Sequence, residues 1–486
     1  MPDPAPNAHE HKARGSVWAA IWCGLAGGAV AAAVELPFLG RYGWDRDELY
    51  FLSAARRPAL GYVDFPPLTA WVGWAVHAVA GNSLVGLRLT SFAAGVGTIL
   101  LVTLMARELG GSWRVQLAAA VGWALLPVSL GSASIFHPTW LDLLAWAAFL
   151  YIALLVLGRP QPRLWPVLGV VGGIGLESKY TIVALFFGLF VGLLATPSRR
   201  LLATRGPWLA LGIALLLLAP NLVWEAQHGW VSIHWFLNPP PSATDETRPG
   251  YVVDLILLTN AVAVPVAVAG TWRLLRDRAV RPLGATVVGT VVAYLLLGGK
   301  SYYAAPVVLF ALAAGALPLD RWATRRRLAI AGAAFVLVLL YALPFAVPVL
   351  PLHTADRAGV IKARSDYQDE VGWHALAAQA GRLSRGADVI LASNYGEAGA
   401  LELFGRNLPP VASTDVTFRY WRPRVAGRSA LLIGFDEKDA SFCSTYRRVG
   451  RIAMPVDNQE RGLPLARCTL DAGLPALWPA LVRRDG

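Results

Sequence analysis

Residues 41–71 read RYGWDRDELYFLSAARRPALGYVDFPPLTAW and lie between two long apolar stretches. Acidic side chains stand close together in this segment, among them Asp47, Glu48 and Asp64, and aromatic residues surround them. Loops that only connect two helices are usually short, whereas the polar segment extends over residues 40–82. Aromatic residues mixed with acidic ones are typical of a folded loop on a membrane surface. We therefore interpret this segment as a candidate site.

The composition indicates a polytopic membrane protein. The chain has 486 residues, of which 56% are hydrophobic and only 15% are charged, against about a quarter charged in soluble domains. The net charge of +12 argues weakly for nucleic acid, because the basic residues lie between apolar stretches and form no patch. We therefore expect no nucleic-acid partner. Three cysteines are too few for a thiolate metal cluster.

About eleven apolar stretches are candidates for membrane spans, which need roughly twenty residues to cross the bilayer core. They cover residues 17–39, 83–106, 115–134, 139–157, 164–176, 181–195, 207–224, 251–272, 282–297, 304–319 and 328–350. Arginine clusters fall in alternate connections, which the positive-inside rule assigns to the cytoplasm. The clusters are Arg107 and Arg114; Arg159 and Arg163; Arg199, Arg200 and Arg205; Arg273, Arg276, Arg278 and Arg281; and Arg321, Arg325, Arg326 and Arg327. The pattern predicts a cytoplasmic N-terminus and an extracytoplasmic C-terminus.

Composition also divides the chain into three parts. Residues 1–16 are polar and predict a disordered cytoplasmic N-terminus. Residues 17–350 predict a membrane domain with an extracytoplasmic first loop at 40–82. Residues 351–486 carry more charge and predict a small soluble extracytoplasmic α/β domain, with strands at 389–392 and 430–433 and a helix at 371–383.

Ionisable residues at membrane depth are costly and are therefore candidates for function. By the predicted topology they all lie on the extracytoplasmic side, together with the acidic residues of the first loop: Arg88, His137, Asp142, Glu177, Lys179 and Lys300. Lysine suits a phosphate group, and a nearby carboxylate can act as general base for a hydroxyl or an amine. The pattern predicts an outer-leaflet cavity for a lipid-linked phosphate donor that enters from the bilayer.

Each of these residues also has a structural interpretation. Lysines at span ends can reach lipid headgroups, a buried aspartate can pair with a cation of the bundle, and tyrosines are common at the membrane interface. A histidine before proline can begin a helix, and an aspartate can belong to a turn. These alternatives apply to Lys179 and Lys300, to Asp142, to Tyr302 and Tyr303, to His137 and to Asp64.

Four motifs in order resemble the GT-C glycosyltransferase superfamily, specifically glycosyltransferase family 39 near the protein O-mannosyltransferases and the aminoarabinose transferases of lipid A. They are RDELY at 46–50, GYVDFPP at 61–67, SKYT at 178–181 and GKSYY at 299–303, and NYGEAGA at 394–400 is also similar to this branch. The resemblance covers most of the chain. It implies a polyprenyl-phosphate sugar as donor and inversion at the anomeric carbon. Together with the predicted topology, we expect a multi-pass protein of the plasma membrane with its site on the extracytoplasmic face.

The resemblance also implies roles for individual residues. Asp47 corresponds to the catalytic base of the family, with Glu48 beside it, and Lys179 and Lys300 match the basic residues that bind the donor phosphate. The sugar and the acceptor, whether lipid, glycan or protein, do not follow from it. The full set of substrate-binding candidates is Tyr50, Asp64, Arg88, His137, Asp142, Lys179, Tyr180, Lys300, Tyr302 and Tyr303.

No cofactor follows with certainty, although carboxylates such as Asp47, Glu48 and Asp142 leave a divalent metal open. Other classes of function remain open as well. A secondary transporter or lipid flippase would place its site near the bilayer midplane, often between internal repeats, and a channel or scaffold would bind a partner through its outer domain. The gathering of charge at the outer edge favours the enzyme.

Cys443 and Cys468 both lie in the predicted extracytoplasmic domain, where disulfides persist. Cys23 lies in the first apolar stretch and cannot reach them. We predict a Cys443–Cys468 disulfide, and the alternative is two separate buried thiols.

Overall fold

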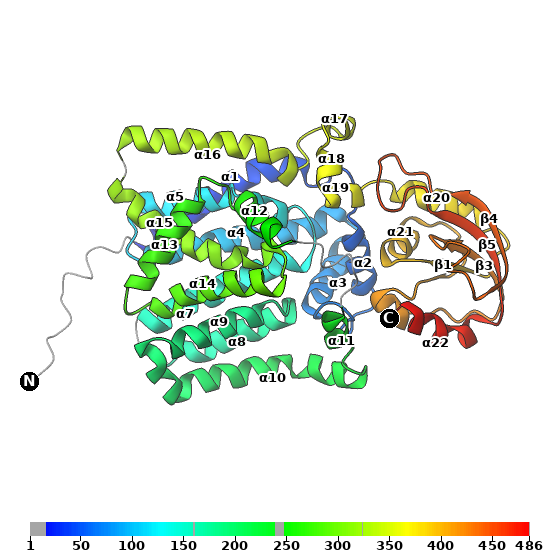
Figure 1. The fold of residues 1–486 in the computed structure, drawn as a ribbon, viewed down its shortest axis with the longest axis horizontal. Coiled ribbons are helices and arrows are strands. Elements are labelled where there is room, and N and C mark those ends of the chain that lie inside the picture. Colours follow the sequence, from blue (N-terminus) through cyan, green and yellow to red (C-terminus); the bar gives the residue numbers. More distant parts are fainter. Residues whose placement is uncertain (1–15, 159–160, 239–246, 323, 486) are drawn as a thin grey trace, which may run out of the picture.

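The computed structural model describes residues 16–158, 161–238, 247–322 and 324–485. Its N-terminal part is a bundle of helices that run roughly along the long axis of the molecule, and a sheet domain lies at one end (Figure 1). The bundle comprises α1 (Val17–Glu35), α4 (Leu84–Glu108), α5 (Trp113–Ala124), α6 (Pro127–Ala133), α7 (Pro138–Gly158), α8 (Leu164–Ser178), α9 (Ile182–Leu194), α10 (Arg205–Gln227), α12 (Arg248–Leu258), α13 (Val264–Arg276), α14 (Arg281–Leu297), α15 (Ala305–Trp322) and α16 (Arg325–Ala346). Shorter elements connect them: η2 (Leu36–Phe38), α2 (Arg46–Ala55), α3 (Leu68–Ala80), η3 (Pro197–Ala203), α11 (Val231–Leu237) and η5 (Ser301–Ala304). The predicted disordered segment 1–16 lies outside the described residues, except for Ser16.

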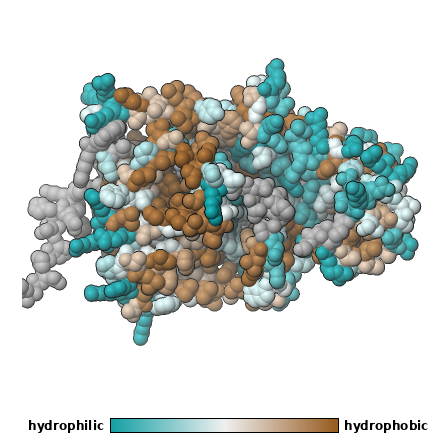
Figure 2. Space-filling view, in the orientation of Figure 1, coloured by the Kyte–Doolittle hydropathy of each residue, from teal (hydrophilic) through white to brown (hydrophobic). Residues whose placement is uncertain are grey.

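Six helices of the described part are long and apolar enough to cross a membrane, or up to eight spans if each of two bent pairs counts as one. Apolar side chains cover the middle of the bundle, and hydrophilic ones gather towards its two ends (Figure 2). This is the structure of a polytopic membrane protein. Three further apolar helices, α3, α8 and α14, are shorter, so the count of about eleven spans stays a prediction.

Two of the predicted spans are broken. The stretch 115–134 forms α5 and α6, which meet at an angle of 59°. Proline at the first position of α6, Pro127, lacks the amide hydrogen that a continuous helix would need there. The stretch 251–272 forms α12 and α13, and Asn260 between them has a φ of 62°. A left-handed residue ends an α-helix, so neither stretch is a single rod.

The C-terminal domain has the α/β character that the sequence predicts. Its five-stranded sheet has the order β2-β1-β3-β5-β4, with β1 parallel to β2 and β3, and β5 antiparallel to β3 and β4. The strands are β1 (Val389–Ala392), β2 (Val411–Ala412), β3 (Ser429–Ile433), β4 (Cys443–Arg451) and β5 (Pro464–Leu470). The helices are α17 (Leu352–Arg357), α18 (Val360–Ala363), α19 (Ser365–Asp369), α20 (Trp373–Leu383), α21 (Tyr395–Phe404), η6 (Val416–Tyr420) and α22 (Leu474–Asp485).

This domain shares a hydrophobic core with the first loop. Leu49 and Phe51 of α2 belong to the same buried cluster as Trp373, Leu401 and Ile433 of the C-terminal domain. Helix α21 packs directly against α2, and both lie at the junction of bundle and sheet domain in Figure 1. Because burial of apolar surface is the main stabilising term in folding, the loop and the domain form one packed unit.

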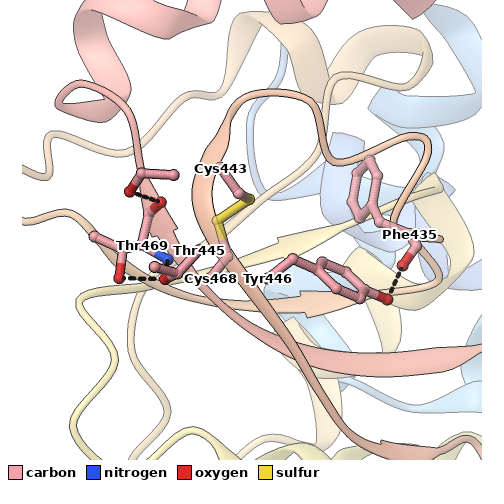
Figure 3. Close-up of a disulfide and its surroundings, with 7 residues drawn as sticks. Phe435, Cys443, Thr445, Tyr446, Cys468 and Thr469 are labelled. Atoms are coloured by element: carbon pink, nitrogen blue, oxygen red, sulfur yellow. Dashed lines mark hydrogen bonds between the residues drawn. A yellow bond between two sulfur atoms is a disulfide. The ribbon is translucent and has the colours of Figure 1, made fainter.

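Cys443 on β4 and Cys468 on β5 are joined by a disulfide, with their Cα atoms 5.7 Å apart (Figure 3). Both strands belong to the same antiparallel pair, so the bond ties two neighbouring strands. Cys23 of α1 is a buried free thiol.

Candidate active site

Helix α2 carries the acidic residues of the first loop and begins with a capping box. The Asp45 side chain accepts a hydrogen bond from the Asp47 amide at 2.8 Å, and Glu48 accepts one from the Asp45 amide at 2.9 Å. These reciprocal bonds satisfy amide groups that a helix start leaves free. They fix where the helix begins and therefore which way Asp47 and Glu48 point.

Asp47 has a carboxylate that is held on both sides yet remains accessible. Tyr395 Oη donates to Asp47 Oδ1 at 2.7 Å, and His137 Nε2 lies 3.3 Å from Asp47 Oδ2. The Asp47 side chain is 33% exposed. Burial raises the pKa of Asp47, but the hydrogen bonds and charges of its neighbours outweigh burial and lower the pKa to about 2. Asp47 is therefore ionised at neutral pH and can accept a proton.

Hydrogen bonds lead from His137 to Lys179. His137 Nδ1 lies 2.8 Å from Thr139 Oγ1 and 3.3 Å from the Thr139 amide, which donates to it. Lys179 Nζ donates to Thr139 Oγ1 at 3.3 Å. The Thr139 hydroxyl thus donates to Nδ1, and Nε2 carries the hydrogen that faces Asp47. The structure brings Asp47, His137 and Lys179 into one polar chain.

Lys179 also lies against two predicted site residues. Its ammonium group is 5.0 Å from the ring centre of Tyr302 and 4.8 Å from that of Tyr303, a cation–π arrangement. Burial lowers the pKa of Lys179 to about 8, with Asp142 opposing and Lys300 adding to the decrease. Lys300 itself is exposed at the start of η5. Electrostatic coupling therefore links the two lysines, but only Lys179 is enclosed by aromatic rings.

Asp142 and Tyr180 are engaged within the bundle. Asp142 accepts hydrogen bonds from Trp146 Nε1 at 2.8 Å and from Thr181 Oγ1 at 2.9 Å, and its side chain is buried. Tyr180 Oη donates to Asn221 Oδ1 at 2.7 Å. These hydrogen bonds do not lead to Asp47, so direct substrate binding by these two residues stays a prediction.

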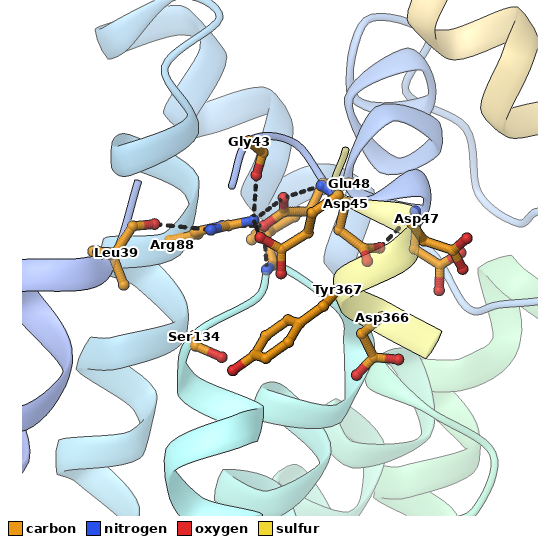
Figure 4. Close-up of polar contacts among 12 residues, drawn as sticks. Leu39, Gly43, Asp45, Asp47, Glu48, Arg88, Ser134, Asp366 and Tyr367 are labelled. Carbon is orange, nitrogen blue, oxygen red and sulfur yellow. Dashed lines mark hydrogen bonds and ion pairs between the residues drawn. The ribbon is translucent and has the colours of Figure 1, made fainter. Parts of the chain in front are cut away.

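Glu48, predicted to be catalytic, and Arg88, predicted to bind substrate, form a buried ion pair. Arg88 donates to both Glu48 oxygens at 2.8 Å, and to the carbonyls of Leu39 and Gly43 at 2.9 and 2.8 Å. Glu48 accepts a further bond from the Phe136 amide at 2.8 Å. Both side chains are at most 1% exposed. In Figure 4 the carboxyl group of Asp47 points away from this pair, and direct roles of Glu48 and Arg88 in the reaction stay predictions.

Tyr50, also predicted to bind substrate, is buried as well. Its side chain is 1% exposed, and its hydroxyl contacts Asp64 Oδ1 and Thr417 Oγ1, each at 2.6 Å. Thr417 also accepts a hydrogen bond from the Val63 amide at 2.9 Å. Tyr50 therefore fastens the C-terminal domain to the first loop. Asp64 is partly exposed. Burial, together with the nearby charge of Asp47, raises the pKa of Asp64 to about 7, although the Tyr50 hydrogen bond opposes the increase.

Sequence reasoning missed Thr139 and assigned no role to Tyr395. Thr139 stands two positions after His137, a spacing that a helix start could have suggested. Tyr395 lies in the NYGEAGA motif at 394–400, which the sequence analysis singled out only by its resemblance. Within the described residues, no group of three or more His, Cys, Asp or Glu side chains is arranged to hold a metal. In particular, Glu48 is held by Arg88 and is not grouped with Asp142.

Comparisons with known proteins agree with this architecture. A family model described as dolichyl-phosphate-mannose-protein mannosyltransferase matches residues 64–224. A curated relative, the lipid A galacturonosyltransferase RgtD of Rhizobium johnstonii, is 29% identical over 187 residues, or 37% of this chain. The match spans only 38% of the length of RgtD.

Solved structures match over nearly the whole chain. The crystal structure of ArnT from Cupriavidus metallidurans has a TM-score of 0.59 at 15% identity and covers 93% of this chain and 97% of ArnT. ArnT bound to undecaprenyl phosphate gives the same TM-score at 14% identity and covers 94% of this chain and 98% of that one. The arabinofuranosyltransferase AftD from Mycobacteria has a TM-score of 0.50 at 16% identity and covers 94% of this chain and 42% of AftD.

These likenesses define the class of the protein as a polytopic membrane protein with the GT-C fold. With the sequence matches added, the comparisons support a GT-C superfamily glycosyltransferase, in agreement with the prediction from the motifs.

Proposed function

We propose that this protein transfers a glycosyl group from a polyprenyl-phosphate donor to an extracytoplasmic acceptor, with Asp47 as general base. The observation that carries the proposal is the Asp47 carboxylate, ionised and one-third exposed between His137 and Tyr395. A base must be deprotonated and within reach of the proton it takes. Asp47 meets the first condition and is accessible to an incoming hydroxyl or amine.

The proposed reaction is a single displacement. Asp47 takes the proton of the acceptor hydroxyl or amine as the acceptor atom bonds to the anomeric carbon of the sugar. The bond between that carbon and the phosphate oxygen breaks, and the polyprenyl phosphate leaves with the electron pair. Attack opposite the leaving group inverts the anomeric centre. Lys179, beside Thr139 and the two tyrosines, supplies positive charge for the phosphate.

One comparison supports a lipid-linked donor, and a second supports glycosyl transfer. ArnT, which has the same fold, binds undecaprenyl phosphate, and RgtD is described as a lipid A galacturonosyltransferase. The proposed acceptor is a lipid, a glycan or a protein, and the proposed sugar is a hexose or a pentose.

We further propose that the site faces the outside of the plasma membrane. Arg273 Nη2 donates to the Leu109 carbonyl at 2.9 Å, so two of the arginine-bearing connections meet at one end of the bundle. The first loop and the C-terminal domain lie at the opposite end (Figure 1). The positive-inside rule places arginine-rich connections in the cytoplasm, and the Cys443–Cys468 disulfide suits an oxidising compartment.

Mass spectrometry of lipids and surface glycans tests the proposal in cells that lack the protein. We expect a sugar-bearing product to disappear, to return with the wild-type chain, and to stay absent with Asp47→Asn. Undecaprenyl phosphate should still bind to purified Asp47→Asn, because the amide keeps the shape and loses only the basicity. Asp457→Asn, at an exposed position, is the matched control and should restore the product. Full product with Asp47→Asn would overturn the assignment of Asp47.

A further inference from the structure

The C-terminal domain reaches into the site through one side chain. Tyr395, the first residue of α21, donates to Asp47 Oδ1 at 2.7 Å across 348 positions of sequence. It is the partner of Asp47 that comes from the C-terminal domain, whereas His137 comes from the start of α7. The two oxygens of Asp47 are thus held from two different domains.

The Tyr395 ring is fixed by what surrounds it. The Arg46 guanidinium lies 4.5 Å from its ring centre, and the Tyr50 ring centre lies 5.0 Å away. The Tyr395 amide donates to Asp415 Oδ2 at 3.0 Å. Asn394 caps α21 in a capping box with Glu397. A ring held in this way keeps its hydroxyl beside Asp47, to which it donates.

Two glycines let α21 approach α2 closely enough for this bond. A Cβ added at Gly396 would lie 2.5 Å from Arg46 Cγ, and one at Gly399 would lie 3.0 Å from the backbone of Leu49. Flexible Arg46 could move aside, but the backbone of Leu49 could not do so without shifting α2. Gly399 therefore sets the distance between the two helices, and that distance brings Tyr395 to Asp47.

Further contacts hold the same interface on either side of Tyr395. Arg57 of the first loop pairs with Glu402 of α21 at 2.6 Å. Ser53 donates to the same carboxylate at 2.9 Å. The placement of Tyr395 therefore depends on a whole interface and not on a single side chain.

We propose that Tyr395 is a positioning residue for the transfer reaction, and that the C-terminal domain thereby completes the active site. The proposal rests on the function proposed above. Tyr395 holds Oδ1 of Asp47, so the carboxylate cannot rotate, and Oδ2, beside His137, keeps one orientation in which to take the proton of the acceptor. The charged or titratable groups that also act on Asp47, or are acted on by it, include His137, Arg46, Asp45, Asp64, Asp369, Lys179 and Tyr302.

Tyr395→Phe removes only the hydroxyl and is the test variant. We expect the initial rate of product formation in membranes that contain the endogenous donor to fall about tenfold or more, as for the loss of a hydrogen bond to a charged group. The dissociation constant for undecaprenyl phosphate, used as the probe, should stay within twofold. Tyr446→Phe is the matched control, because that hydroxyl also lies in the C-terminal domain but donates to the Phe435 carbonyl. It should keep the wild-type rate.

A double-variant cycle separates positioning from general damage to the fold. Asp47→Glu moves the carboxylate, so the Tyr395 hydroxyl no longer donates to it with the geometry of the wild-type hydrogen bond. We expect Tyr395→Phe to lower the rate of the Asp47→Glu protein by less than twofold, because residues that act as a pair are not additive. Equal rate losses in the two backgrounds would mean a structural effect and overturn the proposal. A Tyr395→Phe rate within twofold of wild type would overturn it as well, while inactivity of Asp47→Asn would leave the proposed function intact.

Discussion

Arg88 of α4 donates to both carboxylate oxygens of Glu48 on α2, each at 2.8 Å, in a site that excludes solvent. Glu370, at the end of α19, lies 3.6 Å from the same guanidinium. Burial raises the pKa of Glu370 to about 8, with Arg88 opposing and Glu48 adding to the increase. One buried cation therefore joins a membrane helix, the first loop and the C-terminal domain.

Glu48→Gln should destabilise the protein strongly. It leaves Arg88 buried without its charge partner, and breaking a buried ion pair typically costs about 3–5 kcal/mol. We expect a clear fall in the melting temperature of the detergent-purified protein. Glu402→Gln is the control, because its partner Arg57 is 37% exposed and such pairs contribute about 1 kcal/mol or less. Equal melting temperatures for the two variants would contradict a structural role for Glu48.

Asp64→Asn should change the pH dependence of stability. Burial raises the pKa of Asp64 to about 7, with the Tyr50 hydrogen bond opposing and the charge of Asp47 adding to the increase. The unfolded chain releases this proton near pH 4 and the folded one near pH 7, so the folded state binds more protons between these values. Asp64 therefore costs stability as pH rises from about 4 to about 7, and the full cost persists above pH 7.

The asparagine variant removes that cost and can still accept the Tyr50 hydrogen bond. We expect its melting temperature, relative to wild type, to increase from pH 5 to pH 8. Asp457→Asn, at an exposed position, reports the loss of one charge alone and should show no such trend. If the melting temperatures of Asp64→Asn and wild type differ by the same amount at every pH, the pKa of Asp64 is not raised.

Lys179→Ala should weaken donor binding more than Lys300→Ala does. The Lys179 ammonium is enclosed by Tyr302, Tyr303 and Thr139, whereas Lys300 is exposed. A charge that binds phosphate in both ground and transition states affects the Michaelis constant more than turnover. We expect a higher dissociation constant for undecaprenyl phosphate in the Lys179 variant. The exposed Lys438→Ala is the control, and unchanged affinity in the Lys179 variant would favour headgroup contact instead.

The sequence predicted that Asp47, His137 and Lys179 lie together, and the structure joins these three in one polar chain, because charge next to long apolar stretches is informative on its own. It did not separate Asp47 from its neighbour Glu48. Adjacent residues on a helix point about 100° apart, and only the packing around α2 decides which one faces Arg88 and which one faces the opening. The Asp45–Glu48 capping box was readable from the spacing and would have suggested that Glu48 is committed to the helix start.

Long-range contacts were beyond sequence reasoning. The bonds from Tyr395 to Asp47 and from Tyr50 to Thr417 each join positions more than 300 residues apart, and no local pattern encodes such pairs. The break at Pro127 could have been predicted, since proline interrupts helices. The stretch 115–134 was nevertheless predicted as one span because it is apolar and has the length of a span. The strands at 389–392 and 430–433 agree closely with β1 and β3, because short apolar runs between turn residues are a local signal.

The Cys443–Cys468 disulfide should both stabilise the C-terminal domain and report on topology. It joins positions 25 residues apart, for which the chain-entropy model gives about 3–4 kcal/mol. We therefore expect Cys443→Ser to lower the melting temperature, and reductant to lower the melting temperature of the wild-type protein in the same way.

In a Cys23→Ser background, a membrane-impermeant maleimide should label intact cells only after an impermeant reductant is added. Labelling without reductant would mean that the bond is absent in the cell although the domain is outside. Labelling only in inverted vesicles after reduction would place the domain in the cytoplasm, and the site at Asp47 would then face the cytoplasm as well, since α2 and α21 pack against each other.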